Sequence, residues 1–169
     1  LARVQAESAD FERCTARLSA LRAVQARQQR DMVGRLSSDA LRAEVAAMQS
    51  AAGAGPLGLG AGKAFRLLFG RLRAARAGAE AQAGEMQQML EASFRELNAE
   101  FGFAFGVVPP PALGRYAAEL EIIGARYSRY LGFSQAWRLA VPGFAEQFRR
   151  MLLSKLRVVF ESAAGELEL

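Results

Sequence analysis

Residues 63–101 read KAFRLLFGRLRAARAGAEAQAGEMQQMLEASFRELNAEF, and this stretch carries the strongest periodic pattern in the chain. Apolar or small side chains recur along it every three or four positions, which is the spacing of one face of an α-helix. These positions are Phe65, Phe69, Leu72, Ala75, Ala79, Ala83, Met86, Leu90, Phe94, Leu97 and Phe101. Small residues in the middle of this face let a second helix approach closely. The stretch therefore predicts one long helix that packs against neighbouring helices.

The residues before this stretch predict a second long helix. Between residues 1 and 36, apolar residues recur at intervals of seven, a spacing that indicates coiled-coil character. The first seam consists of Val4, Phe11, Leu18 and Met32, and a second seam holds Cys14 and Leu21. The next residues, Ser37, Ser38 and Asp39, are good N-cap residues. We expect them to start a shorter helix that runs to about residue 50.

Glycine and proline separate the predicted helices. Five glycines and Pro56 fall within residues 53–62, which predicts a loop or tip of unusually apolar composition. Three consecutive prolines at 109–111 cannot continue the long helix. Apolar positions spaced by three or four then indicate further helices over residues 113–131 and 142–169.

These segments predict one all-α domain, because no run alternates with period two for long enough to form a strand. Long helices joined by short breaks favour an elongated antiparallel bundle with coiled-coil character. In this layout the helix that starts at Leu1 packs antiparallel to the helix that starts at Lys63. The expected parts are a helical arm (1–50), a glycine-rich apolar tip (51–62), a long helix (63–104), a proline-rich break (105–112) and C-terminal helices (113–169).

Composition excludes several classes of chemistry. The 169 residues are 51% hydrophobic and 23% charged, which suits a folded domain with a core. The chain has no histidine and one cysteine, Cys14, which excludes a Ser-His-Asp triad, an intrachain disulfide and a cysteine-histidine zinc site. We therefore expect no catalytic, metal-binding or cofactor-binding residue in this chain. No uncharged stretch is long and apolar enough to predict a membrane span.

Charge is unevenly distributed along the chain, whose formal net charge is +5. Residues 51–79 contain five basic and no acidic side chains, whereas residues 80–106 contain five glutamates and only Arg95 as a base. Apolar residues beside arginines at a glycine-rich tip are typical of a membrane-surface element, and a solvated basic helix end is the alternative interpretation. The candidate lipid-binding residues are Leu57, Leu59, Lys63, Phe65, Arg66, Phe69, Arg71, Arg73 and Arg76. Aromatic residues fall on core stripes rather than between basic residues, which disfavours nucleic acid as a partner.

Two further clusters have structural interpretations. Glu96 and Glu100 lie one helical turn apart, and we interpret them as part of a solvated face rather than as acid-base groups. Tyr127, Tyr130 and Trp137 fall near a predicted helix break. We expect these three aromatic residues to form a packed joint, and a binding pocket is the alternative.

Residues 86–169 resemble the helical region that follows the GTPase domain in bacterial dynamin-family proteins. The resemblance rests on FRELNAEFGF (94–103), YAAELE (116–121), YLGFSQAWRL (130–139) and LRVVFESA (156–163). The chain has no complete P-loop and no Asn-Lys-x-Asp motif, so a GTPase domain would lie elsewhere in the same parent chain. The resemblance implies a stalk of antiparallel helices that mediates self-assembly and contacts lipid at one end.

From these patterns we expect a non-catalytic helical stalk that self-associates and contacts an anionic membrane surface through its basic apolar tip. The chain begins with leucine and ends within a helix, so we interpret it as a fragment of a larger protein. Such a fragment would lie in the cytoplasm, at the inner face of the membrane when bound there. The alternative hypothesis is a coiled-coil scaffold that binds a protein partner and has no membrane role.

Overall fold

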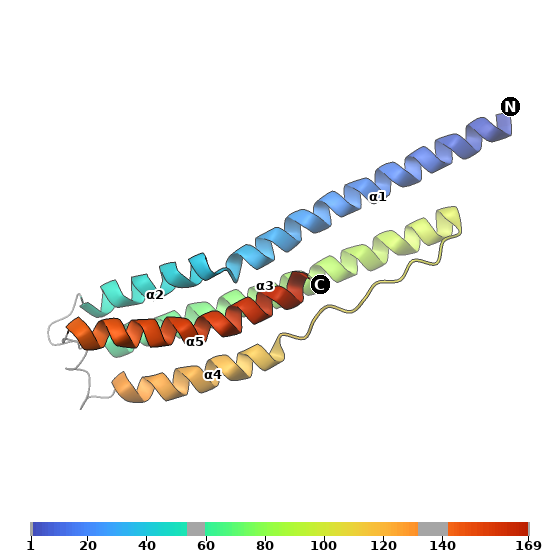
Figure 1. Cartoon of the computed structure of the whole chain (residues 1–169). Coiled ribbons are helices and arrows are strands. Elements are labelled where there is room, and N and C mark those ends of the chain that lie inside the picture. The colour runs from blue at the N-terminus through green and yellow to red at the C-terminus, as the bar shows by residue number, and fades with distance from the viewer. Residues whose placement is uncertain (1, 54–59, 132–141, 169) are drawn as a thin grey trace.

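The computed structural model describes residues 2–53, 60–131 and 142–168, and these residues form helices joined by short connections (Figure 1). No strand occurs within these ranges, so the all-α class predicted from the sequence is confirmed. The elements are α1 (Ala2–Arg35), α2 (Ser38–Gly53), α3 (Ala61–Phe101), α4 (Gly114–Ser128), the 3-10 helix η2 (Arg129–Leu131) and α5 (Pro142–Glu168).

One end of the molecule is a body in which α2, the first half of α3, α4 and α5 pack together (Figure 1). Successive helices of this body run in opposite directions, as the elongated antiparallel bundle predicts. The side-chain pairs that show these directions include Glu44–Arg71 between α2 and α3, Arg73–Glu121 between α3 and α4, and Tyr127–Phe148 between α4 and α5.

The other end is a narrower extension in which α1 runs antiparallel to the second half of α3 (Figure 1). The Arg17 guanidinium joins the two helices, at 2.8 Å from a Glu96 oxygen and 2.5 Å from a Glu100 oxygen. This pairing confirms the predicted antiparallel arrangement. The α2 helix ends at Gly53 and the α3 helix begins at Ala61, on either side of the predicted glycine-rich tip.

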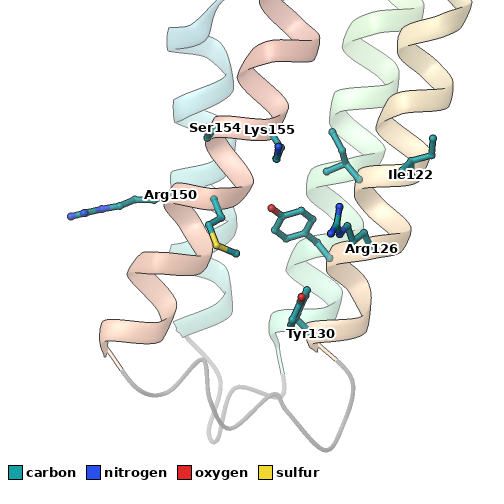
Figure 2. A pocket seen from close by; sticks show the side chains of 9 residues that line it. Ile122, Arg126, Tyr130, Arg150, Ser154 and Lys155 are labelled. Atoms are coloured by element: carbon teal, nitrogen blue, oxygen red, sulfur yellow. The ribbon is translucent and has the colours of Figure 1, made fainter.

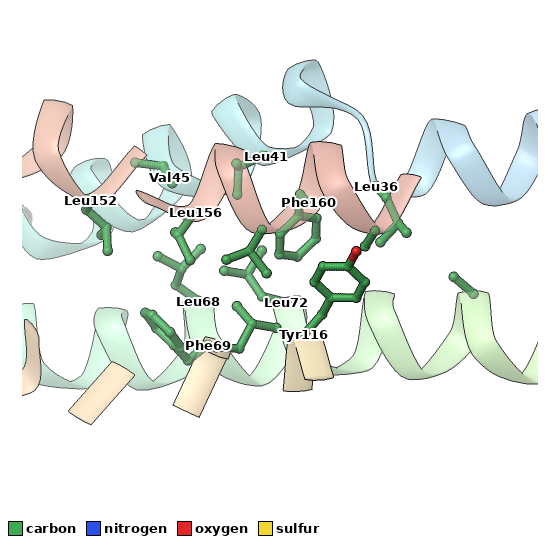
Figure 3. Packing of buried hydrophobic residues seen from close by; sticks show 14 of the residues in the cluster. Leu36, Leu41, Val45, Leu68, Phe69, Leu72, Tyr116, Leu152, Leu156 and Phe160 are labelled. Atoms are coloured by element: carbon green, nitrogen blue, oxygen red, sulfur yellow. The ribbon is translucent and has the colours of Figure 1, made fainter. Parts of the chain in front are cut away.

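The hydrophobic core lies in the body, where α5 packs across α2 and α3 (Figure 3). Its largest fully buried side chains are Met32, Leu36, Leu41, Leu72, Leu97, Leu113, Leu120, Leu152, Leu156 and Val45. In α3, Leu97 is the only buried residue beyond Ala83, and Met86, Leu90 and Phe94 are half-buried. The apolar face of α3 is thus continuous in the sequence, but other helices bury most of its residues only in the first half of the helix.

The helix ends have identifiable local causes. The backbone N–H of Ala40 donates a 3.2 Å hydrogen bond to Ser37 Oγ, which makes Ser37 the N-cap of α2. The α3 helix ends at Phe101 because Gly102 adopts a left-handed conformation (φ 73°) and donates its N–H to the Asn98 carbonyl. The long helix predicted over residues 63–101 therefore ends at the expected residue, and the part 63–104 includes three residues beyond it.

Candidate functional site

The predicted basic apolar tip is only partly at the surface. Phe65 and Phe69 are 3% and 2% exposed, and their ring centroids lie 4.7 Å apart inside the core. Phe65 also lies 6.4 Å from the Phe148 ring of α5. The prediction that these two phenylalanines contact lipid is therefore wrong, since they hold α3 against the rest of the body. Leu57 and Leu59 lie outside the described residues.

Three of the predicted lipid-binding arginines have acidic partners. Arg71 lies 3.1 Å from a Glu44 oxygen, and Arg76 lies 2.6 Å from a Glu80 oxygen. Arg73 donates two hydrogen bonds to Glu121, at 2.5 and 2.7 Å, and this contact lowers the pKa of Glu121 below its ordinary value. These pairs reduce the positive field that the three arginines present to a partner.

Two of the predicted lipid-binding basic residues, both just after the glycine-rich tip, have no acidic partner among the described residues. Lys63 and Arg66 are exposed, and neither forms an ion pair with any residue that the structure describes. Leu67, the neighbour of Arg66, is 53% exposed. Of the predicted site, Lys63 and Arg66 are therefore the described members best placed to contact an anionic surface, together with Leu67.

A cluster of phenylalanines lies at the opposite end of α3, where the sequence patterns predicted no site. Phe94, Phe105, Phe103 and Phe101 form a chain of ring contacts with centroid distances of 5.5, 4.8 and 5.9 Å. The Asn98 side chain holds the turn, because its amide accepts from the Phe105 N–H and donates to the Phe105 carbonyl, each at 2.9 Å. Phe103 and Phe105 stay 43% and 40% exposed.

The first three turns of α1 project past this cluster (Figure 1). Arg17 of α1 pairs with Glu100, one residue before α3 ends, so residues 2–13 have no further turn of α3 beside them. Within residues 4–13, every side chain whose burial is described is exposed, including Val4 at 67% and Phe11 at 73%. We call residues 2–13 the arm. The predicted apolar seam of α1 is thus divided, with Met32 in the core and Val4 and Phe11 in solvent.

A cleft of about 540 Å³ lies between α4 and α5 (Figure 2). Tyr127 and Tyr130 both line it, with ring centroids 6.2 Å apart, and Tyr127 also packs on Phe148, as the predicted packed joint requires. Binding in this cleft stays a prediction. Trp137, the third aromatic residue of the predicted joint, lies outside the described residues. The nine lining residues are Ile122, Ile123, Arg126, Tyr127, Tyr130, Arg150, Met151, Ser154 and Lys155.

The cleft combines apolar walls with positive charge. Ile122, Met151 and Tyr130 are 66%, 45% and 42% exposed, so its apolar surface is open to a partner. Three of the nine lining residues are basic and none is acidic. Arg150 is directed away from the cleft in Figure 2 and pairs with Glu146 at 3.0 Å. Hydrogen bonds from Arg149 and Arg150 lower the pKa of Glu146 below its ordinary value. Arg126 and Lys155 form no ion pair within the described part of the chain.

The acidic residues of the extension are engaged in contacts between helices. Glu96 and Glu100, predicted to form a solvated face, are 69% and 41% exposed, and both bind Arg17. No group of three or more histidine, cysteine or acidic residues that could hold a metal occurs in the described ranges. No helix within those ranges has the length and apolar content needed to cross a bilayer.

Comparison with known proteins gives no relative for this chain. No protein-family model, curated protein or solved structure matches it. The resemblance of residues 86–169 to bacterial dynamin-family proteins, and the GTPase domain that it implies in the parent chain, therefore stay predictions. The basis for a function is therefore the surface of this chain itself, namely the arm, the phenylalanine cluster, the tip and the cleft.

Proposed function

We propose that this chain is a non-catalytic helical assembly module that self-associates through the end of the molecule that carries the arm. The observation that carries the proposal is the exposure of Val4 and Phe11, at 67% and 73%, on one face of the arm. Monomeric proteins rarely leave apolar surface of this kind in one place, and such patches mark sites of interaction.

The charge around this end favours a protein partner over a membrane. The arm contains three acidic residues, Glu7, Asp10 and Glu12, and two basic residues, Arg3 and Arg13, so its formal net charge is −1. Anionic lipid headgroups repel carboxylates, so an apolar surface with acidic neighbours suits contact with protein. A second copy of the chain is the partner that the assembly function requires.

A double substitution on the arm is expected to abolish self-association. The variant Val4→Asp/Phe11→Asp replaces two exposed apolar side chains with carboxylates, whose desolvation at an interface is unfavourable. In size-exclusion chromatography with light scattering, the mass of the wild-type chain should rise with concentration above 18.3 kDa. The double variant should stay at the monomer mass over the same concentration range.

A charge-matched control uses the same helix turns. Gln5→Asp/Ala9→Asp adds the same charge to the arm at two exposed positions away from Val4 and Phe11. This control should associate as the wild-type chain does. A wild-type chain that stays at the monomer mass at the highest accessible concentration would contradict the proposed function.

Peripheral contact with an anionic membrane is a second candidate function. It is favoured by Lys63 and Arg66, which are exposed and form no ion pair with a described residue. Each basic residue near an anionic leaflet contributes roughly 1 kcal/mol of binding. The variant Lys63→Glu/Arg66→Glu should therefore lower co-sedimentation with phosphatidylserine vesicles by at least about tenfold at low salt. The matched control is Arg22→Glu/Arg27→Glu, which makes the same change in net charge on α1. Equal losses in the two variants would show a nonspecific charge effect and exclude a lipid site at the tip.

A further inference from the structure

The arm and the cleft between α4 and α5 lie in different parts of the molecule, and each leaves apolar side chains exposed (Figures 1 and 2). We infer that the arm of one copy docks into the cleft of a second copy. This inference rests on the proposed self-association and names the two surfaces that meet. It makes the cleft a binding site for an amphipathic helix of net charge −1, and it identifies that helix as residues 2–13 of the neighbouring copy.

The charges of the two surfaces are complementary. The arm contains three acids, Glu7, Asp10 and Glu12, and two bases, Arg3 and Arg13, and Asp10 forms an ion pair with Arg13, so its formal net charge is −1. The nine residues that line the cleft contain three bases and no acid. Arg126 on α4 and Lys155 on α5 have no acidic partner within the described residues, so a docked helix would supply one. Partial burial of these charges on docking strengthens their attraction over its value in water.

The apolar residues of the two surfaces match in spacing. Val4 and Phe11 lie seven residues apart on one face of α1, about 10 Å along the helix axis. Ile122 on α4 and Tyr130 on η2 border the cleft eight residues apart, with Met151 of α5 among the lining residues. Recognition of a helix by a groove uses anchors at this spacing. A cleft of about 540 Å³ also falls in the size range that accepts large side chains and ligands.

The arm cannot reach the cleft of its own chain. The α1 helix is 34 residues long, about 50 Å, and its first turns point away from the body (Figure 1). Gln29 donates a 3.0 Å hydrogen bond to the Leu167 carbonyl, and Arg17 binds Glu96, so α1 is held along the bundle at two points. The cleft lies near the opposite end, where α4 finishes and α5 begins.

Docking of an arm into a neighbour's cleft joins two different surfaces, which is a heterologous contact. Each copy then still offers a free cleft or a free arm to another copy, so the contact repeats into an open chain or a closed ring. A contact between two arms related by a twofold axis would instead stop at a dimer. The two arrangements therefore differ in the masses that they allow.

Mixing two defective variants tests the inference. The arm variant Val4→Asp/Phe11→Asp keeps an intact cleft, and the cleft variant Arg126→Glu/Lys155→Glu keeps an intact arm. Each variant alone should associate at least tenfold more weakly than the wild-type chain. An equimolar mixture should form a complex of two chains, twice 18.3 kDa, and no larger species, because only one arm and one cleft remain functional. Circular dichroism of each variant checks that the helices are retained.

Reversal of charge on the arm provides a second, independent test. Glu7→Lys/Glu12→Lys should weaken association of the chain, and combining it with Arg126→Glu/Lys155→Glu in the same chain should restore association. A cleft variant that associates as strongly as the wild-type chain would overturn docking in the cleft. If the arm variant is then still monomeric, the proposed self-association stands and the contact lies between arms. Absence of association in the wild-type chain would overturn both.

Discussion

Replacing Leu156 with alanine is expected to lower the free energy of unfolding by about 2–5 kcal/mol. Leu156 is fully buried on α5, and Figure 3 shows its side chain in the core between α5 and α3, near Leu68 and Leu72. The substitution removes three carbon atoms from a place where four helices meet. Close packing around the site limits how far the neighbours can move into the space. The expected loss therefore includes both the lost burial and a remaining cavity.

Thermal unfolding followed by circular dichroism measures this loss. For a chain of this size the Tm should fall by roughly 4–20 °C. The matched control is Val158→Ala, two residues along the same helix, where the side chain is 62% exposed. That variant should stay within about 0.5 kcal/mol of the wild-type chain. A Leu156→Ala variant as stable as the control would contradict the position of the core in the body.

The sequence predicted the helices because their causes are local. Glycines and prolines mark the breaks, Ser37 caps α2, and the spacing of apolar residues gives the buried faces. The end of α3 also has a local cause, since Gly102 takes the left-handed conformation that ends the helix at Phe101. All of these signals fall within a few residues of the feature that they determine, so one sequence is enough to predict them.

The candidate site was harder to predict because burial depends on which helices lie side by side. Phe65 carries the periodic pattern of a core residue and also sits among basic residues, and only the packing of α5 against it decides between these roles. Phe11 belongs to a regular seam, but α3 ends opposite the arm and leaves it exposed. The cleft brings Arg126 within reach of Lys155 through the approach of α4 to α5, a tertiary contact that no short motif encodes.

Replacing Gly124 with valine is expected to destabilise the chain by about 1–3 kcal/mol, although valine forms helices better than glycine. Gly124 lies on α4 directly against Phe69 of α3. A Cβ atom at this position would lie 3.0 Å from Phe69 Cδ1 and 3.1 Å from Cε1. The Phe69 ring is 2% exposed and packs against Phe65, so it has little room to move. The branched side chain must therefore push α4 away from α3 and open the core between them.

Substitution of a second glycine, Gly84, is expected to stabilise the chain and serves as the control. Gly84 lies inside α3, and a Cβ atom there would meet nothing within 4 Å. Gly84→Ala should therefore stabilise the chain by about 1 kcal/mol through helix propensity alone. Chemical denaturation measures the change in the free energy of unfolding, which should be negative for Gly124→Val and positive for Gly84→Ala. Gly124→Val should cost less in a Phe69→Ala background than in the wild-type chain, because the smaller side chain makes room for the valine. Stabilisation by both glycine substitutions would show that α4 does not pack closely on Phe69.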